Sequence, residues 1–184
     1  MIHQLLPSIE VLSLSTLGIT TAPPEVGTTF LENAQLKAEY YAKLSHIPTL
    51  ADDGGLMIDS LSGEPGIRSN RWLGRPSSDE ELIEYCLHRM KNVPSAHRGA
   101  EFVTTLYFID PETGHRDYSS AEVRGFISEA PVLERMHGYP YRSVFNVDRF
   151  KKNYLHLTPQ EHDIINHRYQ AVKQLSEQLK NWYN

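Results

Sequence analysis

Two adjacent carboxylates, Asp52 and Asp53, follow a short apolar run in the first third of this sequence. The apolar run over 49–51 predicts a strand. The acids and the two glycines after them predict a tight polar turn, and the residues from there to Ile58 predict a second extended piece. In α/β proteins ligands bind at such strand ends, and neighbouring side chains on extended backbone point in opposite directions. One acid is therefore expected to face a binding site while the other supports the loop. A plain surface turn is the alternative.

Capping boxes mark the start of three helices, because a Ser or Thr is followed three residues later by Glu. The boxes occupy residues 29–32, 78–81 and 158–161. We expect the first helix to reach about Leu44, and the last to continue as a single helix to Leu179. β-Branched and aromatic residues predict an antiparallel hairpin with strands over 102–109 and 118–127, and weaker alternation predicts a short strand over 8–14.

Composition excludes several classes of function. The 184 residues carry a formal net charge of -5, so the surface as a whole does not attract a nucleic acid. The single cysteine, Cys86, excludes an internal disulfide and is typical of a reducing, cytoplasmic setting. No stretch has the apolar length of a membrane span, and residues 1–7 lack the pattern of a signal peptide. We expect one cytoplasmic domain over residues 1–184, with neither a membrane nor a nucleic-acid partner.

Two basic features accompany the acids. Lys37 lies at the edge of the apolar stripe of the first helix, so that its stem packs on the core while its ammonium reaches outward. His167 and Arg168 lie early in the last helix, on a turn that also carries apolar residues. Each feature taken alone is equally well explained by a solvated surface side chain.

Taken in sequence order, these features resemble the inosine triphosphate pyrophosphatase family. Residues 27–38 are similar to the family pattern T-F-x-E-N-A-x-x-K-A, and residues 51–56 to A-D-D-S-G-L. Residues 63–71 are similar to G-x-P-G-x-x-S-A-R, and residues 166–168 to S-H-R. The resemblance covers almost the whole chain, and its first two motifs together are highly specific.

The resemblance implies an α/β fold in which a mixed, twisted sheet flanked by helices forms two lobes around a cleft. It also implies a Mg²⁺-dependent homodimer that cleaves non-standard purine nucleoside triphosphates, such as ITP, dITP and XTP, to the monophosphate and pyrophosphate. By position, Asp53 would be the general base and a metal ligand, and Glu25, helped by Asp52, would also hold the metal. Lys37 would contact the phosphates as a point charge.

For the base, the resemblance implies recognition by hydrogen bonds and stacking. His167 and Arg168 would read the 6-oxo group that hypoxanthine has and adenine lacks, and Tyr139 would stack on the purine. A site built on hydrogen bonds rejects the wrong base strongly, because its own polar groups would go unpaired. The remaining implied substrate-binding residues are Gly54, Tyr141, Arg142 and His162.

The sequence also departs from the family pattern. The family begins with a strand and a T/S-x-N-x-x-K phosphate loop, whereas residues 1–6 correspond to the helix after that loop, so we expect the first strand and the loop to be missing. Arg142 stands where the family's G-F-G-Y-D-P-x-F segment has aspartate, and Gly54, Asn166 and His162 replace two serines and a lysine.

These losses leave three hypotheses open. Losing one well-placed electrostatic contact typically slows catalysis on the order of 10²–10³-fold, so several losses predict a slow enzyme. The first hypothesis is a nucleoside triphosphate pyrophosphatase. The second is a catalytically impaired relative that acts as a nucleotide-binding or protein-interaction module. In the third, the missing segment lies upstream or another chain supplies it.

Overall fold

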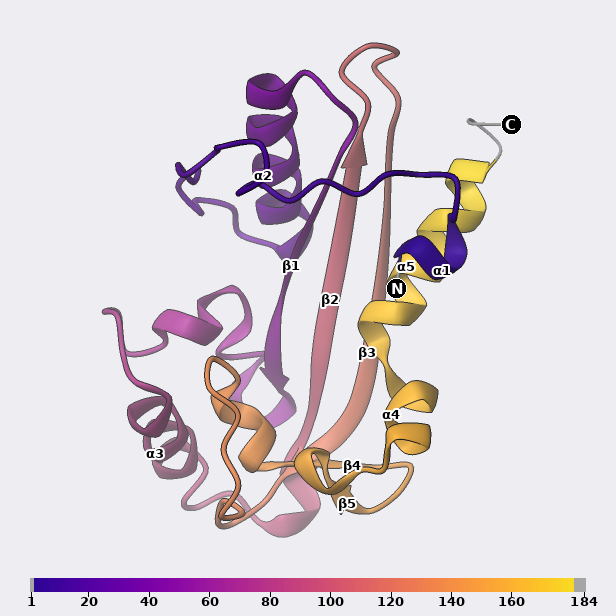
Figure 1. Ribbon diagram of the computed structural model, residues 1–184. Helices are drawn as coiled ribbons and strands as arrows, with labels where there is room; N and C mark the ends of the chain where they lie inside the picture. Colours follow the sequence, from indigo (N-terminus) through magenta and orange to yellow (C-terminus); the bar gives the residue numbers. More distant parts are fainter. Residues whose placement is uncertain (1, 181–184) are drawn as a thin grey trace. The chain divides into compact units, whose positions relative to one another are not determined.

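Helices and an antiparallel sheet make up the described part of the chain, residues 2–180 of a computed structural model (Figure 1). The predicted α/β fold class is confirmed. Within this range the sheet has the strand order β1-β2-β3-β4-β5, and it is antiparallel rather than mixed. The strands are β1 (Thr49–Ile58), β2 (Gly99–Ile109), β3 (Arg116–Ile127), β4 (Phe145–Val147) and β5 (Lys152–Asn153). The helices are α1 (Ile2–Leu5), α2 (Phe30–Ser45), α3 (Asp79–Arg89), α4 (Pro159–Ile165) and α5 (His167–Lys180), with 3₁₀ helices η1 (Asp59–Leu61), η2 (Gly66–Arg71), η3 (Ser95–His97), η4 (Pro140–Ser143) and η5 (Tyr154–His156).

The chain divides into two compact units, each with its own core. Unit 1 contains the described parts of Met1–Gly54, Thr104–Ala121 and His167–Asn184, and unit 2 contains Gly55–Val103 and Glu122–Asn166. Strands β1, β2 and β3 each begin in one unit and end in the other. The expectation of one domain over the whole chain stays a prediction.

Unit 1 is a sheet segment with a helix on each face. Helix α2 packs its buried alanines against Tyr107 and Ile109 of β2, whereas α5 packs against Leu106 and Phe108. Because side chains alternate along a strand, these two pairs lie on opposite faces of β2. The small alanines allow α2 to approach the sheet closely, and this approach brings its polar edge near β1.

Unit 2 has a separate core beneath α3, η4 and β4. Ile83 and Cys86 of α3 are fully buried there together with Val144 and Phe145. Burial raises the pKa of the Cys86 thiol to about 12. The only cysteine of the chain is therefore an inert core side chain rather than a nucleophile.

The helix starts expected from capping boxes are confirmed. Thr29 caps α2, since its hydroxyl accepts a hydrogen bond of 3.1 Å from the N–H of Glu32. Ser78 and Thr158 form complete capping boxes at the starts of α3 and α4. The predicted hairpin is also present as β2 and β3. No helix among residues 2–180 has the length and apolarity needed to cross a membrane.

Two expected elements are wrong. Residues 8–14 form no strand, because local turns take up their polar groups; for example, the Thr16 N–H donates to the Ser13 hydroxyl at 3.1 Å. The last helix is two helices, because Asn166 between α4 and α5 has an extended backbone with φ -65° and ψ 90°. The chain passes from unit 2 to unit 1 at this break.

The expected polar turn after Asp53 is also wrong, because β1 continues without interruption from Thr49 to Ile58. Within unit 2, Gly55 leaves room for the side chain of Ser69 beside the strand. A Cβ atom at Gly55 would lie 2.2 Å from the Ser69 hydroxyl, and that hydroxyl accepts a hydrogen bond of 3.0 Å from the Leu56 N–H. The space left by the absent side chain of Gly55 is therefore occupied by Ser69 of η2.

Candidate functional site

One lysine ammonium joins two acidic side chains in unit 1. The Nζ atom of Lys37 lies 2.6 Å from Oδ1 of Asp53 and 2.8 Å from Oε1 of Glu25. It also lies 3.4 Å from the carbonyl oxygen of Asp52. Lys37 comes from α2, Asp53 from β1 and Glu25 from the segment before α2. The structure thus brings together three residues that the sequence places at separate positions.

Asn33 supports this acid–lysine–acid cluster (Glu25, Lys37 and Asp53) through hydrogen bonds. Its side chain is 1% exposed, and its Nδ2 atom lies 3.4 Å from Oδ2 of Asp53. Its Oδ1 atom accepts a hydrogen bond of 2.9 Å from the Gly27 N–H, which ties down the segment that carries Glu25. Sequence reasoning missed this role of Asn33, although the asparagine of the T-F-x-E-N-A-x-x-K-A pattern was a signal for it.

Burial and charge shift the pKa values of this cluster. Burial raises the pKa of Asp53 above its usual value of 3.8, and the nearby Glu25 charge adds to this effect, while hydrogen bonds from Lys37 and Asn33 oppose it. Burial disfavours the charged form of Lys37, but its hydrogen bonds to Asp53 and Glu25 outweigh burial and raise its pKa. Two acids beside one ammonium therefore keep Lys37 charged, whereas burial makes Asp53 hold a proton more readily than usual.

The neighbouring acid, Asp52, lies on the other face of β1. Its Oδ2 atom is 3.7 Å from Nε of Arg168 in α5, and its side chain is half exposed. Alternation along the strand explains the difference, since Ala51 packs with α2 whereas Leu50 packs with α5. The expectation that the two acids point in opposite directions agrees with this geometry. The proposed help of Asp52 in holding a metal stays a prediction.

Glu25 and Asp53 offer carboxylate oxygens, which are the ligands that a small divalent cation binds. Within residues 2–180, no group of three or more carboxylate, imidazole or thiol side chains is placed to hold a metal ion by itself. Mg²⁺ commonly binds one or two carboxylates and completes its shell with water and substrate phosphates. Two carboxylates that share one ammonium fit this demand.

Two further predicted substrate residues in unit 1 differ in their surroundings. His167 is the first residue of α5 and is buried, whereas Arg168 is partly exposed beside Asp52. Gly54 follows Asp53 within β1 and is partly buried. Their contacts with a substrate stay predictions.

A cation–aromatic cluster forms in unit 2 from Tyr139, Arg142, Tyr154 and His162. The Arg142 guanidinium lies 4.0 Å from the ring centroid of Tyr139 and 4.9 Å from that of Tyr154. Tyr154 in turn contacts His162 edge to face at 4.9 Å. Burial lowers the pKa of His162, and the Arg142 charge lowers it further. Three predicted substrate residues therefore lie together, joined by Tyr154, which sequence reasoning missed and for which the sequence carried no signal.

Tyr141 is a core residue of unit 2. Its ring is buried, and its hydroxyl donates a hydrogen bond of 2.7 Å to the carbonyl of Ser69. Burial raises the pKa of this hydroxyl. Tyr141 thus joins η4, to which it belongs, to η2, and its predicted contact with substrate stays a prediction.

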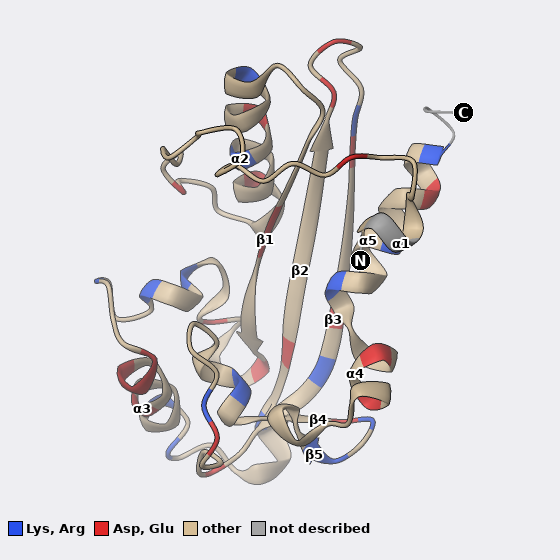
Figure 2. Cartoon of the chain, in the orientation of Figure 1, with Lys and Arg blue, Asp and Glu red and all other residues tan. Residues whose placement is uncertain are grey.

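Charged residues are dispersed over the described elements. Figure 2 shows lysines and arginines interspersed with acidic residues on the helices and loops, without a continuous basic stripe along any described element. This distribution agrees with the net charge of -5.

The fold and these contacts define an α/β protein of two compact units, with a lysine-bridged pair of acids between a helix and a strand of unit 1. A Ham1 family model matches residues 2–178, and the chain belongs to this family. It is 40% identical over 158 residues to a dITP/XTP pyrophosphatase of Thermus thermophilus, covering 86% of this chain and 74% of that protein. Against a dITP/XTP pyrophosphatase of Yersinia pseudotuberculosis it is 35% identical over 178 residues, covering 94% and 86%. The structure of the Staphylococcus aureus Ham1 protein is similar with a TM-score of 0.86 and 32% identity, covering 97% of this chain and 91% of that one.

Proposed function

We propose that this protein hydrolyses non-standard purine nucleoside triphosphates, such as ITP, dITP and XTP, to the monophosphate and pyrophosphate. The observation that carries the proposal is the single ammonium of Lys37 held between Asp53 and Glu25. Relatives named dITP/XTP pyrophosphatase support the choice of substrate.

Asp53 is suited to take a proton from the attacking water. Its pKa is raised by burial, and a general base works best when its pKa lies closer to the operating pH. Hydrogen bonds from Lys37 and Asn33 fix the orientation of the carboxylate before substrate arrives. Preorganised groups of this kind need little rearrangement during the reaction.

Lys37 is suited to bind the phosphates. Its ammonium stays charged because its pKa is raised, and it carries three donors that can exchange a carboxylate for a phosphate oxygen. Glu25 and Asp53 would hold Mg²⁺, which neutralises charge on the phosphates when it is bound. After product is released, the carboxylates of Glu25 and Asp53 would again pair with the ammonium of Lys37. This positive charge limits the repulsion between the two carboxylates.

Base recognition is assigned to groups that can stack and donate hydrogen bonds. In unit 2, the ring of Tyr139 is 44% exposed and is braced by Arg142, so it offers a firm surface to a purine. In unit 1, the ion pair with Asp52 holds Arg168, whose donors suit the 6-oxo group together with those of His167. His162 contacts Tyr154, which lies beside the same Arg142, and contacts of His162 and Tyr141 with substrate belong to this proposal.

We further propose a cytoplasmic homodimer, in keeping with the single buried, reduced cysteine and with the family resemblance. A second candidate function is a nucleotide-binding or protein-interaction module with little catalysis. The positive Arg142, where the family pattern has an acid, favours that alternative.

Pyrophosphate release from dITP and XTP with Mg²⁺ tests the proposal, with Asp53→Asn as the matched control. Release that depends on Asp53 is expected for a pyrophosphatase. Equal, background release from both proteins at high concentration would reject catalysis. Calorimetry with ITP and IMP then decides whether the chain binds nucleotide without cleaving it, and sedimentation measures its oligomeric state.

A further inference from the structure

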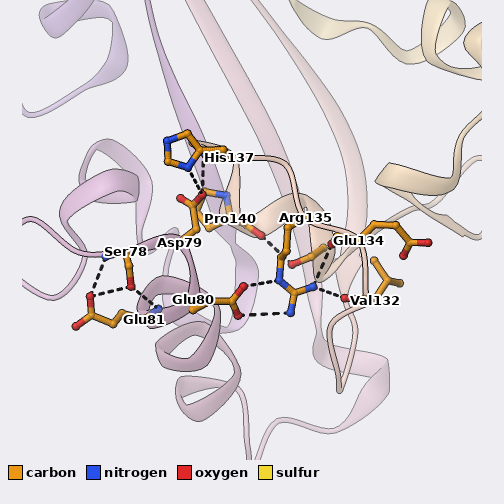
Figure 3. A network of polar contacts seen from close by, with 11 residues as sticks. Ser78, Asp79, Glu80, Glu81, Val132, Glu134, Arg135, His137 and Pro140 are labelled. Carbon is orange, nitrogen blue, oxygen red and sulfur yellow. Dashed lines mark hydrogen bonds and ion pairs between the residues drawn. The ribbon is translucent and has the colours of Figure 1, made fainter.

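Acidic side chains in the first turn of α3 bind the loop between β3 and η4, which leads to Tyr139 (Figure 3). Oδ2 of Asp79 accepts a hydrogen bond of 2.8 Å from the backbone N–H of Gly138 and lies 3.5 Å from Nδ1 of His137. All of these residues belong to unit 2. The contact places a carboxylate on the backbone immediately before the ring that is proposed to stack on the base.

A second carboxylate on the same turn holds the loop from another side. Oε1 of Glu80 lies 2.6 Å from Nε of Arg135, and its Oε2 atom lies 3.4 Å from Nη2. The same guanidinium donates to the carbonyls of Val132 and Glu134, so it also closes the loop on itself. Figure 3 shows these bonds converging on Arg135.

The three acids of this turn have different partners. Glu81 belongs to the capping box, since its carboxylate accepts the N–H of Ser78 at 2.8 Å. Asp79 and Glu80 reach out to the loop instead. Stabilisation of the helix start alone, which any acid in a first turn provides, does not account for these two directed contacts.

Other contacts hold the loop near its ends, since the Val132 N–H donates to the Ser143 carbonyl at 2.9 Å and Glu134 lies 3.0 Å from His156, but the backbone just before Tyr139 is bound by Asp79. Leu133 at its tip is 96% exposed, and Gly138 has a left-handed φ of 78°. A mobile loop would have to lose conformational entropy when a base stacks, which weakens binding. Beyond the loop, the Tyr139 N–H donates to the Met136 carbonyl at 2.9 Å and Arg142 braces the ring.

We propose that Asp79, with Glu80 beside it, is a positioning residue that presets Tyr139 for stacking on the purine base. The proposal rests on the proposed function, because it takes Tyr139 as the base-stacking ring. Asp79 acts through the Gly138 backbone and touches no substrate. Its effect is therefore expected in nucleotide affinity and KM rather than in kcat.

Asp79→Ala, Asp79→Asn and Glu81→Ala test this inference, with calorimetric titration of IMP as the main readout. We expect Asp79→Ala to weaken IMP binding by about tenfold, the loss of one hydrogen bond to a charged group. Asp79→Asn keeps an oxygen acceptor for the Gly138 N–H and should restore most of the affinity. Glu81→Ala should lower the melting temperature through the lost cap, with IMP affinity unchanged.

An NMR spectrum of the ¹⁵N-labelled protein adds a readout that needs no nucleotide. The Gly138 amide resonance should move in Asp79→Ala and stay in place in Glu81→Ala. An unmoved Gly138 amide, or equal losses of affinity in Asp79→Ala and Glu81→Ala, would overturn the inference. If the unmodified protein releases no pyrophosphate from dITP or XTP and binds no IMP while the Gly138 amide responds as expected, the proposed function fails and the contact of Asp79 with the loop stands.

Discussion

Lys37 of α2 donates a hydrogen bond of 2.6 Å to Asp53 of β1, sixteen residues further along the chain. Both side chains lie on the face of the sheet that α2 covers, because Ala51, two residues before Asp53, packs against that helix. The alternation of β1 sends Asp52 to the other face, beside Arg168. The two adjacent acids therefore differ in partner, burial and expected function.

Asp53→Asn should abolish most of the activity, whereas Asp52→Asn should not. Loss of a general base typically costs 10²–10⁴-fold in rate, so we expect a fall of about that size in kcat for Asp53→Asn. Asp52→Asn weakens an exposed ion pair of 3.7 Å and should change kcat by less than about tenfold. Pyrophosphate release measures both, and similar kcat values for the two variants would contradict the assignment.

The pKa of Asp53 in the metal-free protein should respond to its two charged neighbours in opposite directions. The negative charge of Glu25 raises this pKa, so Glu25→Gln should lower it. Hydrogen bonding and charge from Lys37 lower it, so Lys37→Met should raise it further above the usual 3.8. A ¹³C NMR titration with chelator present follows the Asp53 carboxyl. Shifts in the same direction for both variants would rule out the cluster as described.

Asn33→Ala should destabilise unit 1. The change removes a buried side chain that bonds to the Gly27 N–H and to Asp53, and leaving such groups unpaired costs about 1–3 kcal/mol. Urea unfolding measures the loss. Gln35→Ala on the same helix is the control, because the Gln35–Glu39 pair is worth only about 0.2–0.5 kcal/mol. Equal effects would show that Asn33 adds no more than a surface residue.

Arg98→Met should destabilise the protein more than Arg124→Met. The buried guanidinium of Arg98 donates to the backbone carbonyls of Ile127 (2.7 Å) and Met90 (2.8 Å), among others. Each buried acceptor left without a donor costs about 1–3 kcal/mol, so a loss of about 3 kcal/mol or more is expected. Arg124 makes exposed ion pairs that are worth about 0–1 kcal/mol. Urea midpoints that rank Arg124→Met as the more destabilised variant would contradict this.

Signals that act within a few residues were read correctly from the sequence alone. The capping residues Thr29, Ser78 and Thr158 located the starts of α2, α3 and α4, because a cap and the N–H that donates to it lie within one helical turn. Complete boxes form at α3 and α4, whereas at α2 the Glu32 carboxylate accepts from the Thr28 N–H at 2.6 Å. The family resemblance named Glu25, Lys37 and Asp53 by position, and these three side chains do lie together, while their roles stay predictions.

Packing between distant segments decided the rest. Ser69 of η2 packs against Gly55, where β1 continues through an expected polar turn, and the last helix is divided at Asn166, where the chain passes from unit 2 to unit 1. Contacts across the sequence likewise chose Asn33 as the support of Asp53 and Tyr154 as the neighbour of Arg142. A helix start is stabilised by hydrogen bonds between residues that are close in the sequence, so a local pattern predicts it. The continuity of a strand and the partners of a side chain depend on residues that meet only after the chain has folded.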